Sequence, residues 1–190
     1  MFKKLITVSA GVVLASGLAA CGSSSDSGSG GSGGSGDITM GFAQVGAESG
    51  WRTANTKSIQ ASAKDAGIKL KFSDAQQKQE NQIKAIRSYI QQKVDVIAFS
   101  PVVETGWDTV LQEAKRAKIP VILTDRAVDS SDKSLYKTFL GSDFVLEGNK
   151  AGQWVVDNAA TNDVNKDGKI NVVEIQGTTG AAPAIDRKKG

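Results

Sequence analysis

The 190-residue sequence contains no histidine and a single cysteine. Without histidine, the protein cannot carry a histidine-based catalytic triad, a histidine-ligated metal or a histidine pH switch. One cysteine excludes an internal disulfide and a cysteine-rich zinc site. The apolar fraction of 39% and the charged fraction of 23% are typical of a soluble globular protein, so we expect a folded body with a core.

The sequence also has almost no excess of positive over negative residues. The formal net charge is +3, but two of the positive charges, Lys3 and Lys4, lie within the first 20 residues. Of the 23 Lys and Arg residues, 21 remain elsewhere, against 20 Asp and Glu. The sequence has no basic patch with interleaved aromatic side chains, so it gives no indication of a nucleic-acid partner.

Residues 1–20 have the pattern of a secretory signal, because Lys3 and Lys4 precede an apolar stretch, 5–18, and small residues lead to Cys21. The apolar stretch is too short and too rich in Ala, Gly and Ser to predict a membrane span. The residues before and including Cys21, Leu-Ala-Ala-Cys, resemble a bacterial lipobox, which implies that Cys21 becomes a lipidated N-terminus after cleavage. A plain signal peptide with a chance cysteine is the alternative.

The segment 21–36 then reads as the lipidated cysteine and a tether. Residues 22–36 comprise seven Gly, seven Ser and one Asp. This composition cannot bury apolar surface and predicts a flexible coil with a typical span of about 20 Å. We therefore expect an extracytoplasmic body held at the membrane through a lipid anchor.

From residue 37 the sequence alternates between strand and helix patterns. Apolar runs predict strands at 37–45, 69–72, 94–99 and 121–124, and one-faced periodicity predicts helices at 51–66, 80–92 and 106–117. Repeated strand–helix units with short connections imply a parallel, doubly wound α/β sheet. The carboxyl ends of its strands would share one edge, where such sheets bind ligands.

Polar and aromatic side chains follow three of these predicted strands. They are Glu48, Ser49, Trp51 and Arg52 after the first strand, Ser100-Pro101 after the third, and Asp125-Arg126 after the fourth. A carboxylate accepts two hydroxyl hydrogen bonds, a guanidinium donates several in a fixed fork, and an aromatic ring covers the C–H face of a sugar. These residues thus fit a sugar, and an Asp–Arg ion pair beside a core tryptophan is the alternative interpretation.

Several longer motifs resemble the type I periplasmic sugar-binding proteins of ABC importers, at 41–52, 76–82, 125–126 and 176–190. The resemblance extends over 37–190 and implies a periplasmic-binding-protein-like I fold, in which a monosaccharide binds between two parallel-sheet α/β lobes. By position, it implies that the sugar contacts are Glu48, Ser49, Trp51, Arg52, Asp125, Arg126 and, from the second lobe, Arg187. For Arg187 the alternative is an exposed helix arginine. The residues expected only to pack are Trp107, Trp154 and Tyr136.

Residues 163–171 fit the first nine positions of a calcium-binding loop, with oxygen donors at alternate positions and Gly168 at the tight turn. The ligands of this structural Ca²⁺ would be Asp163, Asn165, Asp167, the carbonyl of Lys169, and Asn171. Glu174 stands at the twelfth position, but a strand predicted at 169–176 would point it away. Some family members carry a similar loop whose closing glutamate comes from a distant segment. A polar turn that uses Asn and Asp for turn chemistry is the alternative.

The first lobe would run from 37 to 141. The remaining residues, 142–190, contain a helix pattern at 145–158, the strand pattern at 169–176 and the start of another helix. Because one strand cannot form a sheet, we expect an incomplete second lobe and a sequence that is part of a longer protein.

These features predict a monomeric receptor that delivers a monosaccharide, galactofuranose-like or another aldose, to an ABC permease. A sugar-sensing component for chemotaxis or for a sensor kinase is the alternative, because it would share the fold. The sequence has no G-x-G-x-x-G turn, no P-loop and no nucleophile–base pair, so we expect neither an enzyme nor a catalytic cofactor.

Overall fold

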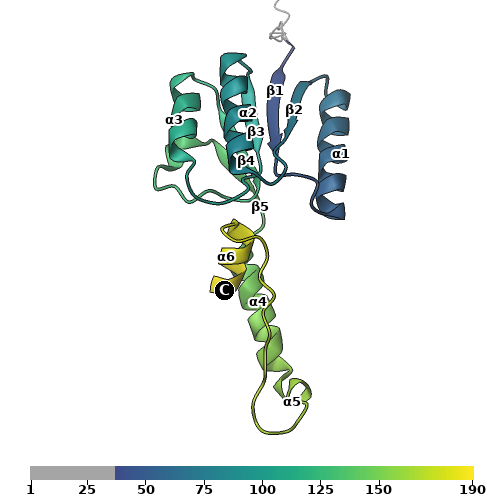
Figure 1. Cartoon of the computed structure of the whole chain (residues 1–190). Helices are drawn as coiled ribbons and strands as arrows, with labels where there is room; N and C mark the ends of the chain where they lie inside the picture. The colour runs from purple at the N-terminus through teal and green to yellow at the C-terminus, as the bar shows by residue number, and fades with distance from the viewer. Residues whose placement is uncertain (1–36) are drawn as a thin grey trace, which may run out of the picture. The chain divides into compact units, whose positions relative to one another are not determined.

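Figure 1 shows the computed structural model of the chain, which describes residues 37–190. The secretory signal, Cys21 and the Gly/Ser segment lie outside the described residues, so what the sequence predicts for them stays a prediction. Within 37–190, no helix combines the length and the apolar character needed to cross a membrane.

Five parallel strands form one sheet in the order β2-β1-β3-β4-β5. They are β1 (Thr39–Gln44), β2 (Lys69–Asp74), β3 (Val96–Phe99), β4 (Val121–Asp125) and β5 (Thr138–Gly141). The sheet confirms the predicted α/β fold class, and β1 to β4 correspond to the four predicted strands. Sequence reasoning missed β5, because only one of its four residues, Phe139, packs against the core. This edge strand is defined by its pairing with β4 rather than by apolar content.

Three helices cover the two faces of the sheet. In Figure 1, α1 (Gly50–Asp65) lies on one side of the sheet, and α2 (Gln79–Gln91) and α3 (Asp108–Arg116) lie on the other. The main core forms beneath α2 and α3, and its fully buried side chains include Ile86, Ile97, Phe99, Leu111 and Leu123. Trp107 is 1% exposed and donates its indole N–H to the Val103 carbonyl, so its predicted packing role is correct. Tyr136 also packs against this core.

A short 3-10 helix, η1 (Lys133–Leu135), precedes β5. After β5 the chain forms α4 (Phe144–Asp157), α5 (Ala159–Asn162) and α6 (Ala182–Lys189). α4 corresponds to the helix predicted at 145–158. α6 packs closely against α4 at Gly148, where a Cβ atom would overlap the Arg187 carbonyl oxygen. Glycine is therefore the residue that allows the two helices to approach.

The strand predicted at 169–176 is wrong, because this segment has no regular secondary structure. A strand needs a neighbour for its N–H and C=O groups, and within 37–190 this segment pairs with no other strand. Its side chains Val172, Val173 and Ile175 are 68%, 88% and 92% exposed. The packing predicted for Trp154 is wrong as well, since α4 packs mainly against α6 and leaves this indole 61% exposed.

Candidate functional site

Arg52 lies at the centre of a charged network at the carboxyl edge of the sheet. The Ser49 hydroxyl accepts a hydrogen bond from the Arg52 backbone N–H (3.1 Å) and so caps the start of α1. The Arg52 side chain is 3% exposed. Its Nε donates to Glu48 Oε1 (3.1 Å), its Nη2 to Asp125 Oδ2 (2.7 Å) and its Nη1 to Ser100 Oγ (3.3 Å). The guanidinium thus connects the loops that follow β1, β3 and β4.

Asp125 ends β4 in a left-handed conformation (φ 62°), which is uncommon for a residue other than glycine. The next N–H, that of Arg126, donates back to the Thr124 carbonyl at 2.6 Å. This tight reversal places the Asp125 carboxylate and the Arg126 guanidinium together, with 3.7 Å between Asp125 Oδ2 and Arg126 Nε. Such a strained backbone at a sheet edge is a feature of functional sites.

Arg126 is buried but incompletely hydrogen-bonded. Its Nη1 donates to the carbonyls of Val102 (3.2 Å) and Pro101 (3.5 Å), and its Nη2 lies 3.7 Å from Glu48 Oε1. Its Nε is buried and has no hydrogen-bond partner among the described residues. Burial lowers the pKa of Arg126, and the charge of Arg52 lowers it further, whereas Asp125 and Glu48 act in the opposite direction. A buried donor without a partner is costly, so a ligand oxygen at this point would stabilise the site.

Trp51 lies at the surface rather than in the core, with 57% of its area exposed. The guanidinium carbon of Arg52 stands 4.8 Å from the centre of its ring. The alternative interpretation of a core tryptophan is therefore wrong for Trp51. Its ring is available beside the charged network, and the adjacent Arg52 holds it by a cation–π contact.

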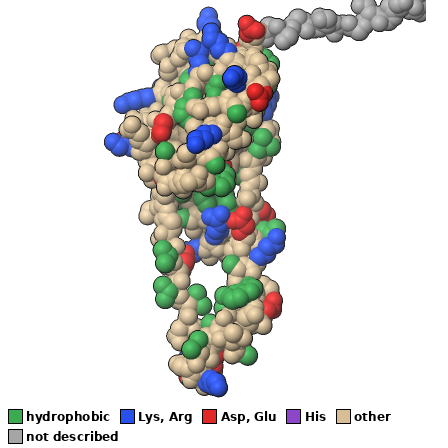
Figure 2. Space-filling model, turned by 90° about the vertical axis from the view of Figure 1, so that its right-hand side faces the viewer, with side chains coloured by type: hydrophobic (Ala, Val, Ile, Leu, Met, Phe, Trp, Pro, Cys, Tyr) green, Lys and Arg blue, Asp and Glu red, His purple; other side chains and the backbone are tan. Residues whose placement is uncertain are grey.

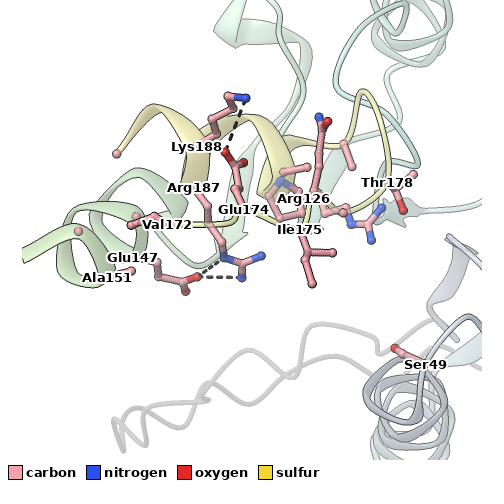
Figure 3. Close-up of a pocket in the computed structure, with 18 of the residues that line it drawn as sticks. Ser49, Arg126, Glu147, Ala151, Val172, Glu174, Ile175, Thr178, Arg187 and Lys188 are labelled. Carbon is pink, nitrogen blue, oxygen red and sulfur yellow. Dashed lines mark hydrogen bonds and ion pairs between the residues drawn. The ribbon is translucent and has the colours of Figure 1, made fainter. Parts of the chain in front are cut away.

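Arg187 projects from α6 and is paired with α4. Its Nε and Nη2 both lie 2.8 Å from Glu147 Oε2, and its guanidinium stands 4.5 Å from the centre of the Phe144 ring. Figure 3 shows this pair, together with the nearby ion pair between Lys188 and Glu174. Glu174, the doubtful calcium ligand, is thus paired with a lysine.

A cavity of about 920 Å³ is lined both by residues at the carboxyl edge of the sheet and by Arg187 of α6. It lies within the range of about 300–1,000 Å³ that is typical of small-molecule sites. Of the seven predicted sugar contacts, four line it: Glu48, Ser49, Arg126 and Arg187. The other three do not line it, although Arg52 and Asp125 hold Glu48 and Arg126 in place.

Sequence reasoning placed Ser100 at this edge but missed Gln82, which also supports it. Gln82 is fully buried on α2, donates to the carbonyls of Ser100 (2.6 Å) and Ala43 (3.2 Å), and accepts from Val102 N–H (2.9 Å). The Ser100 hydroxyl donates to the Thr124 carbonyl (2.7 Å). The available signal was the spacing of Gln82 four residues before Ile86, which places a glutamine on the buried face of the helix.

The predicted calcium loop is closed by its own hydrogen bonds. The two carboxylate oxygens of Asp163 accept from the N–H groups of Asp167 (3.1 Å) and Gly168 (2.9 Å), and Asn165 donates to Asp167 Oδ2 (2.9 Å). Two carboxylates and an amide in one loop have the donor chemistry that Ca²⁺ prefers. No group of three or more Asp, Glu or Cys residues that could hold a metal ion occurs within 37–190. The calcium site therefore stays a prediction.

Comparisons with known proteins agree with this architecture. The chain is 56% identical over 154 residues to the galactofuranose-binding protein YtfQ of Escherichia coli (strain K12), covering 80% of this chain and 46% of that protein. It is 38% identical over 161 residues to the fructose import binding protein FruE of Bifidobacterium longum, covering 83% of this chain and 48% of that one. The chain thus spans about half the length of the curated relatives it matches.

Solved structures and a family model extend the comparison. A Mycobacterium smegmatis protein in complex with β-D-fucofuranose is 66% identical, with a TM-score of 0.75 over 80% of this chain and 49% of that one. The family model of the periplasmic binding protein domain matches residues 40–190. The match covers the sheet from Met40 onward, the charged network and the Arg187 helix, so the chain belongs to the periplasmic binding protein domain family.

Proposed function

We propose that the chain is the sugar-binding part of an extracytoplasmic receptor for an ABC importer, and that its ligand is a monosaccharide in the furanose form. The observation that carries this proposal is the network of Glu48, Arg52, Asp125 and Arg126 at the carboxyl edge of the sheet, with the Arg126 Nε buried and without a hydrogen-bond partner among the described residues. The relatives named for galactofuranose and solved with fucofuranose support the furanose form.

The charge balance of the network favours a neutral polyol. Two guanidinium groups stand against two carboxylates, so the network offers no excess charge to an anion such as a phosphate. Arg52 uses Glu48 Oε1 and Asp125 Oδ2, which leaves the second oxygen of each carboxylate for sugar hydroxyls. Arg126 Nε would donate to a further sugar oxygen.

The remaining predicted contacts fit secondary roles. The exposed Trp51 ring would cover the C–H face of the sugar, and Ser49 would contribute a hydroxyl beside the start of α1. Arg187, now paired with Glu147, lines the same cavity from α6 and would close on the ligand from the opposite side. Closing two lobes around a ligand is how such receptors would signal the loaded state to a permease.

The cellular setting is part of the proposal. Cys21 would carry the lipid, residues 22–36 would tether the body, and the receptor would act as a monomer outside the cell membrane. The Escherichia coli relative at 56% identity carries the name of a binding protein and not of an enzyme, which supports a role without catalysis. A sensory role would use the same site, and a permease gene beside this one would favour the importer.

Calorimetric titration of the complete product of the gene tests the ligand class. Of galactofuranose, galactose, arabinose and ribose, we expect galactofuranose to bind in the micromolar range or below and galactose to bind more weakly. Arg126→Ala should weaken binding by about 2–4 kcal/mol, because buried polar groups lose their partner. Arg87→Ala is the matched control, since Arg87 forms an exposed pair with Glu113 on α2 and α3. Millimolar or weaker binding of all four sugars would end the monosaccharide proposal.

Metabolic labelling with palmitate tests the anchor separately. The wild-type chain should incorporate the label, and Cys21→Ala should not. Label retained in Cys21→Ala would contradict the assignment of the lipidation site without affecting the sugar proposal.

A further inference from the structure

The edge of the sheet opposite the candidate sugar site is strongly basic. This amino edge consists of the strand starts, the helix carboxyl ends and η1. Its exposed basic residues are Lys64, Lys69, Lys93, Lys115, Arg116, Lys118, Lys133 and Lys137, against Asp37, Asp65, Asp95 and Asp132. Figure 2 shows Lys and Arg side chains gathered at the end of the body where the described chain begins.

Helix capping explains only part of this charge. Lys64, Lys115 and Arg116 lie in the last turns of α1 and α3, where the helix dipole favours cations. Lys93 and Lys118, however, occupy left-handed positions (φ 53° and 60°) just after α2 and α3. These are positions at which glycine or asparagine is favoured, so the sequence keeps a lysine there at a conformational cost.

Two of the acidic residues at this edge are engaged locally. Asp95 Oδ2 accepts the Thr39 backbone N–H at 2.7 Å. The Asp132 carboxylate accepts hydrogen bonds from Ser134 and lies 3.7 Å from Lys115 Nζ. Because the amino edge has eight basic residues against four acidic ones, it keeps an excess of four positive charges at its surface.

A second cavity, of about 330 Å³, opens in this surface. Lys115, Lys118 and Lys137 line it, with the Ser134 hydroxyl at its wall and the buried side chains of Ile119 and Leu135 beneath. No carboxylate among the described residues lines it. Cations and a hydroxyl above an apolar floor suit a phosphodiester group that is attached to apolar chains.

We propose that the amino edge docks on anionic phospholipid headgroups, with the cavity between Lys115, Lys118 and Lys137 receiving a headgroup phosphate. The proposal rests on the lipid anchor of the proposed function, since Cys21 lies 16 residues before Asp37 and the chain enters the sheet at this same edge. A tether with a typical span of about 20 Å keeps the surface at high effective concentration near the lipid. The docked body would hold the sugar site, at the opposite edge, open to the solution.

Vesicle co-sedimentation of the complete gene product carrying Cys21→Ser, so that no acyl chain contributes, tests the docking surface. Each basic residue near an anionic membrane should raise the partition coefficient by about fivefold. We expect binding to vesicles of 30% phosphatidylglycerol in phosphatidylcholine, none to pure phosphatidylcholine, and loss of binding as salt shortens the screening length. The triple variant K115E/K118E/K137E, which removes three positive charges and adds three negative ones, should lose binding by more than about 100-fold.

The matched control is K57E/K84E/K150E, which changes the net charge equally on exposed helix positions away from the amino edge. It should keep most of the binding. Because charge reversal at Lys118 could disturb the end of α3, the neutral variant K115Q/K118Q/K137Q and the melting temperature of each variant are measured as well. The neutral triple should melt like the wild type and still lose binding by more than tenfold.

Three results would overturn the proposal. One is the absence of binding to phosphatidylglycerol vesicles at low salt, and another is an equal loss in the K57E/K84E/K150E control. The third is displacement by inorganic phosphate at concentrations where sodium chloride of equal ionic strength has no effect, because this would assign the cavity to a free anion. Sugar titration and palmitate labelling are unaffected by these outcomes, so failure here is distinguishable from failure of the proposed function.

Discussion

Arg52 and Asp125 lie 73 residues apart in the sequence and are joined by a 2.7 Å hydrogen bond between Nη2 and Oδ2. The bond links the first turn of α1 to the end of β4, across the intervening strand β3. Glu48 and Ser100 complete the surroundings of the same guanidinium. The charged network is therefore both the proposed ligand site and a structural connection between the loops of the sheet edge.

Arg52→Ala should destabilise the protein strongly. The substitution leaves Glu48 and Asp125 without their main partner in a site where the side chains are only 19% and 23% exposed. Removing one partner of a buried ion pair costs about 3–5 kcal/mol, and the partial exposure of the carboxylates places the expected loss near the lower limit. Chemical denaturation gives the free energy of unfolding. Arg87→Ala, which breaks the exposed pair with Glu113, should leave it nearly unchanged.

Gln82→Ala should weaken sugar binding, because the Gln82 side chain fixes the backbone between Ser100 and Val102 beside the site. Its amide fixes the Ser100 and Val102 backbone, and the Val102 carbonyl in turn accepts from Arg126. Loss of a buried group with three hydrogen bonds should lower stability by about 1–3 kcal/mol. Calorimetry at a temperature where the variant is fully folded should also show weaker binding, and Gln92→Ala on the exposed end of the same helix should show neither effect. Unchanged affinity in folded Gln82→Ala would limit Gln82 to a structural role.

Most elements of the first lobe, and the proximity of its candidate site residues, were predictable because one rule governs each. Apolar periodicity indicated β1 to β4 and the three helices, and the carboxyl ends of parallel strands must share an edge. That rule alone brings Arg52, Ser100 and Asp125 together, as the structure shows. The position of the Asp125-Arg126 pair was thus predictable, although its strained backbone was not.

The features that were missed depend on contacts that a pattern does not contain. β5 exists because β4 offers it a free edge, and the apolar run at 169–176 remains unpaired because no strand lies beside it. Trp154 is exposed for the same reason, since packing needs a partner and not only an apolar face. Gln82 looks like an ordinary polar residue at a helix start, although its spacing from Ile86 places it on the buried face, and its hydrogen-bond partners become apparent only when α2 is placed over the sheet edge.

Glu104→Gln should stabilise the protein at neutral pH. The Glu104 backbone N–H donates to the Gly180 carbonyl (2.9 Å), which joins the loop after β3 to the loop before α6. Burial, and then the charges of Asp186 and Asp129, raise the pKa of the Glu104 carboxyl above its usual 4.5. The folded state therefore binds the proton more tightly than the unfolded state, and stability falls as pH rises from about 4.5 through the folded pKa.

Glutamine removes this loss, so the melting temperature of Glu104→Gln should exceed that of the wild type at pH 7 and match it near pH 4. The gain should stay below about 1 kcal/mol, because Glu104 is only partly buried. Glu80→Gln, on the exposed first turn of α2, is the control and should show no gain at either pH value, because its charge favours the helix start. An equal or larger gain at pH 4 would contradict the charge-based explanation.

Calcium should raise the melting temperature if the oxygens of the loop at 163–171 are its ligands. Asp163 and Asp167 now accept hydrogen bonds from the loop backbone, so a bound ion must replace or share these contacts. At a concentration ten times the dissociation constant, binding to the folded state adds about 1.4 kcal/mol, and EGTA should reverse it. Asp163→Asn should abolish the shift, whereas Asp157→Asn on the neighbouring α4 should keep it. A shift retained in Asp163→Asn would place the ion elsewhere. No shift in the wild type would leave Asp163 and Asp167 as turn residues, since their side chains already satisfy the backbone of the loop.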